Sequence, residues 1–282
     1  MKKASLIFGL LFLTVTGFAQ EEIVVNNAIE FIQAIGPNRT IVLNNGDFKL
    51  DEAGTYSNEY VHWTPVFDGV ELNIEGAANL KIHGKGKARI LAAPRYAWVI
   101  MFNDCDNLEM VGVTIGHEEA GYCTGGVLGF NDCQQVTIQK CDLYGSGTEG
   151  MYFSYCKEVN VSATAIHDCS YDLLSFNNSS KIKFSACSFL KTGEFDLVTF
   201  ISSSEIKFVK CMFKQNFNGD FMPYLFNIDE SSSAIVLETC KITDNKVTKF
   251  VNDLNKITLK KNKFSGNTFK DFTDSFLNKN QK

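Results

Sequence analysis

Residues 153–189 read FSYCKEVNVSATAIHDCSYDLLSFNNSSKIKFSACSF and contain one short pattern twice. Each copy has an aromatic residue, an apolar residue six positions later, and a second apolar residue seven positions after that. The residues are Phe153, Val159 and Ile166 in the first copy and Phe176, Ile182 and Phe189 in the second, 23 positions further on. Between these landmarks, apolar and polar residues alternate, which is typical of strands.

The same pattern extends outward to seven copies. Successive copies are offset by 28, 23, 23, 24, 29 and 22 residues, which is too short for a helix-plus-strand unit. A strand-like repeat of this length predicts a solenoid, in which each coil buries its apolar face only against its neighbours. The first apolar positions are Leu108, Val136, Val159, Ile182, Ile206, Ile235 and Ile257, and the second are Ile115, Leu143, Ile166, Phe189, Phe213, Ile242 and Phe264.

Aromatic residues and cysteines recur at fixed phases of this repeat. We expect inward stacks of them, since cysteine at an inward position behaves as a small apolar residue. Strands about 4.8 Å apart would also allow an occasional disulfide. Cys123 and Cys169 fall in turns and are the better candidates for bridging or special chemistry. The aromatic stack comprises Phe102, Phe130, Phe153, Phe176 and Phe200, and the two cysteine ladders comprise Cys105, Cys133 and Cys156, and Cys141, Cys187, Cys211 and Cys240.

Four regions are expected along the chain. Residues 1–19 combine two lysines, an apolar run and a small-residue ending, which predicts a signal peptide and a protein secreted to the bacterial periplasm or beyond. Residues 20–68 are read as an N-terminal cap, with a helix at 27–36, a strand, turn and strand at 40–50, and a loop at 55–68. The coils should occupy residues 69–272, and residues 273–282 form a tail that could contain a short helix.

Charge and hydropathy exclude some classes of partner. The net charge of −5 is not basic enough to indicate nucleic-acid binding. No apolar stretch reaches the roughly 20 residues that a membrane-spanning helix needs. The charge is uneven, because residues 1–180 carry a net −10 and residues 181–282 a net +5. Such asymmetry could orient the molecule toward a charged polymer.

The pattern of apolar residue, Asn or Asp corner and short alternating strands resembles the right-handed parallel β-helix superfamily. The segments TIVLNNGDF at 40–48 and LKIHGKG at 80–86 are similar to the entry of pectin-lyase-like β-helices. The resemblance covers residues 25–272. It implies an all-β, right-handed, single-stranded parallel β-helix of about eight coils with a short N-terminal helical cap. This fold carries lyases, hydrolases, epimerases and adhesins, so it implies no single activity.

The least repetitive and most polar turns are those at 116–126, 144–150 and 167–172. Equivalent turns of neighbouring coils should stack on one side of the solenoid, where longer turns on a rigid scaffold commonly carry function. We therefore predict one functional region on these turns. Its catalytic candidates are Glu119, Glu149, His167 and Asp168, and its substrate-binding candidates are His117, Tyr122, Tyr144, Tyr171 and Asp172.

Two kinds of glycan chemistry could use these residues. A carboxylate pair such as Glu119 and Glu149 could cleave a glycosidic bond if the two pKa values differ. Alternatively, His117 or His167 could act as a base while Tyr144 donates to the leaving oxygen, as elimination at a uronate requires.

A metal ion is a further alternative at these turns. Glu118, Glu119 and Asp168 could provide oxygen ligands for Ca²⁺. No short ligand spacing supports a transition metal, so the identity of any metal stays open.

Known enzymes of the pectin-lyase-like fold differ from this chain. Pectate-lyase-like enzymes use a coil-borne arginine, whereas Arg39, Arg89 and Arg95 all precede the second coil. Polygalacturonase-like enzymes carry an Asp-Asp pair and a Gly-His-Gly motif, and this sequence contains neither. Two hypotheses follow: a polysaccharide lyase or glycoside hydrolase, or a non-catalytic module that binds a glycan or a partner protein.

Overall fold

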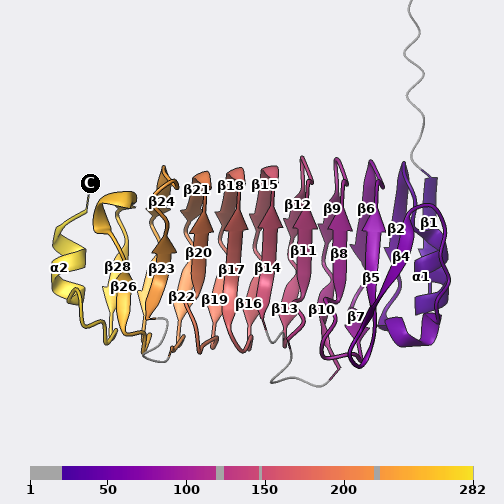
Figure 1. The fold of residues 1–282 in the computed structure, drawn as a ribbon, viewed down its shortest axis with the longest axis horizontal. Helices are drawn as coiled ribbons and strands as arrows, with labels where there is room; N and C mark the ends of the chain where they lie inside the picture. Colours follow the sequence, from indigo (N-terminus) through magenta and orange to yellow (C-terminus); the bar gives the residue numbers. More distant parts are fainter. Residues whose placement is uncertain (1–20, 119–123, 146–147, 219–222, 282) are drawn as a thin grey trace, which may run out of the picture.

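The computed structural model describes residues 21–118, 124–145, 148–218 and 223–281, which form an all-β parallel solenoid of about eight turns. Figure 1 shows the coils side by side along one long axis, with a helix at each end. The predicted fold class is therefore confirmed.

Three parallel sheets make the sides of the solenoid, and within the described residues they have ten, nine and nine strands. Sheet A contains β1 (Glu21–Val25), β2 (Arg39–Leu43), β6 (Leu80–Gly84), β9 (Glu109–Val111), β12 (Thr137–Gln139), β15 (Lys157–Ser162), β18 (Ser180–Ser185), β21 (Ser204–Val209), β24 (Ile235–Glu238) and β27 (Ile257–Lys260). Sheet B contains β3 (Gly46–Lys49), β7 (Ala88–Ala92), β10 (Thr114–His117), β13 (Asp142–Tyr144), β16 (Ala165–His167), β19 (Ser188–Leu190), β22 (Met212–Lys214), β25 (Lys241–Thr243) and β28 (Lys263–Ser265). Sheet C contains β4 (Val61–Val66), β5 (Gly69–Glu75), β8 (Ile100–Asn103), β11 (Leu128–Asn131), β14 (Glu149–Ser154), β17 (Asp172–Asn177), β20 (Val198–Ile201), β23 (Tyr224–Ile228) and β26 (Lys249–Val251).

A typical coil runs along sheet C, then sheet A, then sheet B, before a longer turn returns it to sheet C. The corner from sheet C to sheet A is tight, and Asp104, Asp132 and Asn178 there have left-handed φ values of 51°, 50° and 49°. Asn and Asp tolerate this conformation better than most residues. The polar corners that the sequence predicted are therefore a backbone requirement of the coil.

The core is a set of stacked rows that follow the repeat. Val159 pairs with Ile182 in sheet A, and Ile166 pairs with Phe189 in sheet B. In sheet C the predicted aromatic row forms near-parallel rings, with neighbouring centroids 5.3, 5.3, 5.5 and 5.1 Å apart. These rings are buried, so they are core residues and not a ligand platform.

Helices close both ends of the solenoid. Helix α1 (Ala28–Ala34) is capped by Asn27, whose Oδ1 accepts a hydrogen bond of 2.9 Å from the backbone N–H of Glu30. Helix α2 (Asp274–Lys279) is capped by Thr273 and buries Leu277 against the last coil. Two short 3₁₀ turns, η1 (Leu50–Ala53) and η2 (Leu254–Lys256), complete the helical content of the described residues.

One local prediction at the N-terminal end was wrong. The predicted loop at 55–68 contains β4, which pairs antiparallel with β5 at the edge of sheet C. The chain covers a solenoid sheet there, so tertiary pairing overrides the local signal. The strand, turn and strand predicted at 40–50 are present as β2 and β3, which lie in sheet A and sheet B.

Eight of the cysteines lie among the described residues, and all eight are buried and free. Cys133 contacts both Cys105 and Cys156, and Cys211 contacts both Cys187 and Cys240. Cys169, which was predicted as a candidate for bridging, is also buried, and its thiol lies 3.6 Å from the carbonyl oxygen of His167. Cys123 lies outside the described residues.

Candidate functional site

The longer turns that lead from sheet B to sheet C pass around a corner of the solenoid. Residues that end a sheet B strand therefore face a different side from residues that begin a sheet C strand. Tyr144 ends β13 and His167 ends β16, whereas Glu149 begins β14 and Asp172 begins β17. The single functional region predicted from sequence is thus divided between two faces.

At the sheet C end of these turns, three carboxylates occupy the same position on successive coils. Glu149 and Asp172 are register partners, and Asp196 follows because Leu174 pairs with Val198. We call Glu149, Asp172 and Asp196 the acidic row. Adjacent parallel strands are about 4.8 Å apart, so the backbone positions of neighbouring residues in the row are one strand spacing apart.

Burial raises the pKa of all three carboxyl groups in the acidic row. The pKa of Asp172 rises to about 8, first because of burial and then because of repulsion from Glu149 and Asp196. Burial also raises the pKa of Glu149 and of Asp196. Asp196 is held by the backbone N–H of Tyr224 at 2.8 Å and by Asn227 Nδ2 at 2.7 Å. Asp172 is therefore a carboxylic acid that keeps its proton at neutral pH.

The side chains around Asp172 leave it open to a ligand. The Ser175 hydroxyl lies 3.4 Å from Glu149 Oε1 and 3.5 Å from Asp172 Oδ2 and bridges the two carboxyl groups. Oδ1 of Asp172 is buried and has no hydrogen-bond partner among the described residues. A pocket of about 210 Å³ opens here, lined by Thr148, Glu149, Tyr171, Asp172 and Phe195.

Aromatic side chains flank the acidic row. Tyr171 and Phe195 meet edge to face at its pocket, with ring centroids 4.5 Å apart. Trp98 lies in the same row two coils before Glu149, with Gly126 between them, and its ring centroid is 6.0 Å from that of Tyr152. A Cβ on Gly126 would come within 2.2 Å of the indole, so this glycine leaves the space that Trp98 occupies.

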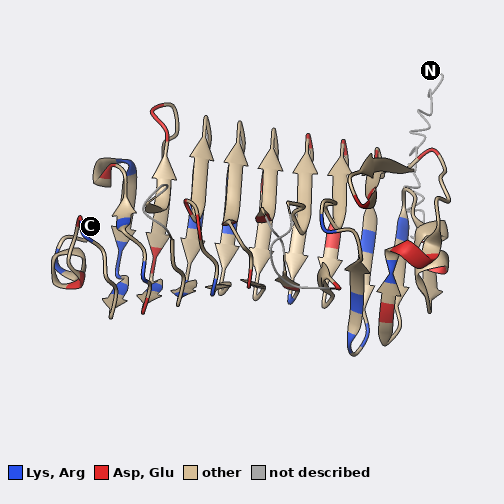
Figure 2. Cartoon of the chain, turned by 60° about the horizontal axis from the view of Figure 1, so that its bottom comes forward, with Lys and Arg blue, Asp and Glu red and all other residues tan. Residues whose placement is uncertain are grey.

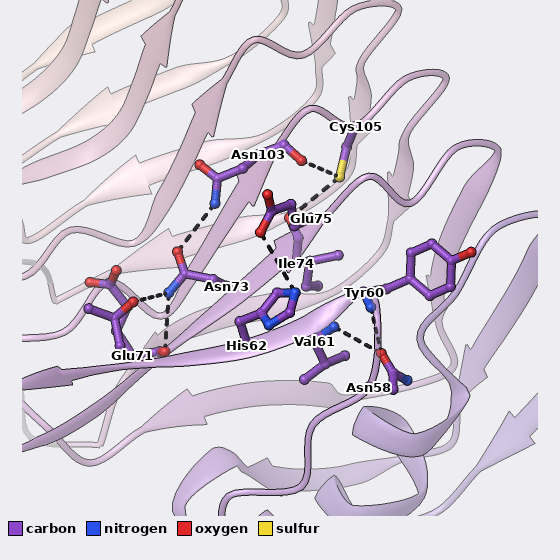
Figure 3. Close-up of polar contacts among 11 residues, drawn as sticks. Asn58, Tyr60, Val61, His62, Glu71, Asn73, Ile74, Glu75, Asn103 and Cys105 are labelled. Carbon is purple, nitrogen blue, oxygen red and sulfur yellow. Dashed lines mark hydrogen bonds and ion pairs between the residues drawn. The ribbon is translucent and has the colours of Figure 1, made fainter.

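Trp98 is held from the first coil. Its backbone N–H donates to Glu71 Oε2 at 2.8 Å. Figure 3 shows the neighbouring contacts, in which Asn103 Nδ2 donates to Asn73 Oδ1 and Asn73 Nδ2 donates to the Glu71 carbonyl, at 3.2 and 3.3 Å. This polar ladder fixes the outer surface of sheet C on the N-terminal side of the acidic row.

On the outer face of sheet B, four predicted or neighbouring residues form what we call the imidazole cluster: Asp142, Tyr144, His167 and Asp168. His167 Nε2 lies 3.0 Å from Asp142 Oδ1, and its Nδ1 lies 2.6 Å from Asp168 Oδ2. The hydrogen bond to Asp142, followed by that to Asp168, raises the pKa of His167 against the effect of burial. The Tyr144 ring stacks on this imidazole with centroids 5.9 Å apart.

The imidazole cluster borders an open groove of about 410 Å³ that also includes Lys87, Arg89 and Thr114. Arg89 is occupied, because its Nε donates to Asp47 Oδ1 at 2.7 Å. Both ring nitrogens of His167 are also occupied by carboxylates. The raised pKa of His167 favours its charged form, and neither of its ring nitrogens is available to take a proton from a substrate.

The other predicted residues lie elsewhere. His117 is fully buried, its Nε2 lies 2.9 Å from the Ala97 carbonyl oxygen, and burial lowers its pKa. A substrate cannot reach it there. Glu118 pairs with Lys49 at 3.1 Å. Glu119 and Tyr122 lie outside the described residues. Within the described ranges, no three His, Cys, Asp or Glu side chains are arranged to hold a metal ion.

The chain is similar to known proteins in family and in fold. The family described as "Right handed beta helix region" matches residues 98–269. A search of curated proteins gives no match. No helix of the described residues has the length and apolarity to cross a membrane.

Several solved structures share the fold. A pectate lyase from Bacillus sp. N165 in complex with trigalacturonate is 12% identical, with a TM-score of 0.58 and coverage of 90% of this chain and 83% of its own. An alginate lyase from Paenibacillus sp. FPU-7 is 11% identical, with a TM-score of 0.57 and coverage of 90% and 96%. A pectin methylesterase from Aspergillus niger is 12% identical, with a TM-score of 0.55 and coverage of 88% and 82%. At these identities the likeness concerns the fold.

Proposed function

We propose that this chain, which belongs to the right-handed beta helix family, is a polysaccharide-active enzyme. The solved structures that share its fold include polysaccharide lyases and a pectin methylesterase, which supports this proposal. We propose further that it is a glycoside hydrolase that acts at the acidic row. The signal-like residues 1–19 support secretion to the bacterial periplasm or beyond. The observation that carries the proposal is the half-buried Asp172 carboxyl group, whose buried Oδ1 has no partner among the described residues and whose pKa is about 8, at a pocket next to Glu149.

The proposed reaction assigns different roles to two carboxyl groups. Asp172 transfers its proton to the glycosidic oxygen as the bond between that oxygen and the anomeric carbon breaks. We assign Glu149 the role of the ionised partner, whose negative charge helps to keep the proton on Asp172. Water then supplies a hydroxyl group to the sugar and returns a proton to Asp172.

The spacing of the row favours one stereochemical course. Strands about 4.8 Å apart place Glu149 and Asp172 near the roughly 5–5.5 Å carboxyl separation of retaining glycosidases. In that geometry Glu149 attacks the anomeric carbon directly, and water hydrolyses the resulting glycosyl ester. Asp196, which is held by Tyr224 and Asn227 outside the pocket lining, maintains the repulsion that raises the pKa of Asp172.

The other two hypotheses have less support. Elimination at a uronate needs a free base, and both nitrogens of His167 are bound to carboxylates. A binding module needs no buried carboxyl oxygen without a partner, because that oxygen reduces stability without improving recognition. Each hypothesis nevertheless predicts its own signal in one assay.

The test is a panel of polysaccharides incubated with the mature protein, with and without Ca²⁺. New reducing ends report hydrolysis, and ultraviolet absorbance reports the unsaturated uronates that a lyase makes. Asp172→Asn and Glu149→Gln should each reduce hydrolysis by at least about 100-fold. Asp132→Asn, at a corner where Asn is tolerated, is the matched control and should keep full activity.

Three results would contradict the proposal. Unsaturated products would indicate a lyase. A rise in Tm when a polysaccharide is added, without any product, would indicate a binding module. Full hydrolysis by Asp172→Asn would remove Asp172 from the reaction.

A further inference from the structure

A third hollow, of about 700 Å³, lies on later coils at the sheet B end of the same series of turns. Three consecutive turns, those after β19, β22 and β25, contribute to it. We call it the basic corner; it is lined by Lys191, Gln215, Asn216, Phe217, Asp244 and Lys246.

The floor of the basic corner is rigid. Asn216 and Asn245 are fully buried, and their Nδ2 atoms donate to the carbonyls of Phe189 and Phe213, each at 3.0 Å. Asn216 Nδ2 also donates to Asn245 Oδ1 at 3.0 Å, which ties one turn to the next. Side chains mounted on these turns are therefore held at fixed spacing before any ligand arrives.

Phe217 is placed at the surface without a role in the core. Its side chain is 49% exposed although its backbone N–H is bonded to the Thr192 carbonyl at 2.9 Å. The ring lies over Gly193, where a Cβ would come within 2.5 Å of the ring carbon Cδ2. The equivalent residue on the next coil is Lys246, which shows that the coil does not need an aromatic residue here. An exposed phenyl face of this kind suits the C–H face of a sugar ring.

Two lysines line the same pocket as this ring. Lys191 comes from the preceding turn and Lys246 from the following one, and neither forms an ion pair with another described residue. Asp244 is the one carboxylate of the lining, and residues 181–282 as a whole carry a net +5. Figure 2 shows lysine and arginine on the C-terminal coils as well as on the first ones. An acidic polymer would therefore be attracted to this corner.

We propose that the basic corner binds an acidic sugar unit of a polysaccharide. The sugar ring stacks on Phe217, and its carboxylate or sulfate group lies between Lys191 and Lys246. The Gln215 amide is placed to hydrogen-bond a hydroxyl group. This site would attach the protein to an acidic polymer separately from any reaction at the acidic row.

Affinity electrophoresis tests the site with three soluble polymers: polygalacturonate, chondroitin sulfate and neutral dextran. The protein carries Asp172→Asn throughout, so binding is measured without turnover and does not depend on the proposed catalytic function. We expect retardation by at least one acidic polymer and none by dextran. Comparing the two acidic polymers distinguishes a carboxylated ligand from a sulfated one.

Substitutions in the basic corner test whether the acidic polymer binds there. Lys191→Ala with Lys246→Ala should weaken binding about tenfold, and Phe217→Ala should weaken it several-fold. The matched control is Lys183→Ala with Lys260→Ala, which makes the same charge change on the exposed side of sheet A. It should change the affinity less than twofold. Equal loss in the control, equal retardation by dextran, or no retardation by either acidic polymer would overturn the proposal.

Discussion

The Asp172 carboxyl group binds its proton more tightly in the folded protein than in the unfolded chain. Its folded pKa is about 8, against roughly 4 when unfolded. The stability associated with this proton is complete below about pH 4 and is lost as the pH rises through 8. At alkaline pH the buried charge therefore opposes folding.

Asp172→Asn removes this charge and should raise Tm at pH 9, by about 2–4 °C for each kcal/mol relieved. At pH 4, where the carboxyl group is neutral, wild type and variant should unfold at similar temperatures. Thermal unfolding followed by circular dichroism at the two pH values checks this. A variant that is less stable than wild type at pH 9 would contradict the burial argument.

The pKa of His167 is also raised in the folded protein, but for a different reason. Its pKa is raised first by the hydrogen bond to Asp142, so its contribution to stability is complete below about pH 6.5 and is lost as the pH rises through the raised pKa. His167→Gln should cost on the order of 1 kcal/mol at pH 5.5 and clearly less at pH 9.

Urea unfolding at both pH values measures the His167 effect. His62→Gln is the control, because His62 pairs with Glu75 at 3.7 Å in a more exposed position. If the cost of His167→Gln is independent of pH, the imidazole is not held in its charged form.

Among the elements, the stacked Phe rows carry the core. Phe153 lies between Phe130 and Phe176, with centroid distances of 5.3 and 5.5 Å. Phe153→Ala removes these two stacked contacts and the edge contact with Phe184 and leaves a cavity, so we expect a loss of about 3–5 kcal/mol of unfolding free energy. Phe67→Ala, at a side chain that is 87% exposed, should change it by less than about 0.5 kcal/mol. Equilibrium unfolding in urea compares the two, and similar losses would mean that the ring row does not stabilise the coils.

Strands inside the repeat could be predicted from the sequence because each apolar landmark has an equivalent one coil away. Val159 and Ile182, for example, are partners in sheet A. The elements before the repeat lack such a counterpart. The strands β2 and β3 could therefore be predicted but not assigned to their sheets, and the segment that contains β4 was predicted as a loop.

Only some residues of the acidic row and its surroundings could be predicted from the sequence. Glu149 and Asp172 were identified because they stand in polar turns. Asp196 and Trp98 were missed because the turns differ in length, which hides the shared position until the strands are aligned. The expectation that Tyr144 would face the same region failed because the turn rounds a corner of the solenoid between β13 and β14.

At the scale of the whole molecule, the thiols should become reactive only when the protein unfolds. All eight described cysteines are buried, and burial raises the pKa of Cys141 to about 11. In a Cys123→Ser background, the eight described cysteines should not react with Ellman's reagent until the protein unfolds, and should then react together. A reducing agent should leave Tm unchanged. Thiols that react in the native protein, or a Tm lowered by reduction, would indicate exposed or bridged cysteines.

The one-directional stacking of coils also has a mechanical consequence. The hydrogen bonds between coils run along the solenoid axis, so a pull on the two chain ends loads them one coil at a time, as in a zipper. Each released coil adds 22–29 residues of slack, or roughly 75–100 Å of extended chain. Force applied to the molecule would therefore be dissipated in a series of small ruptures, and a stretched molecule could lose its end coils while the central ones stay intact.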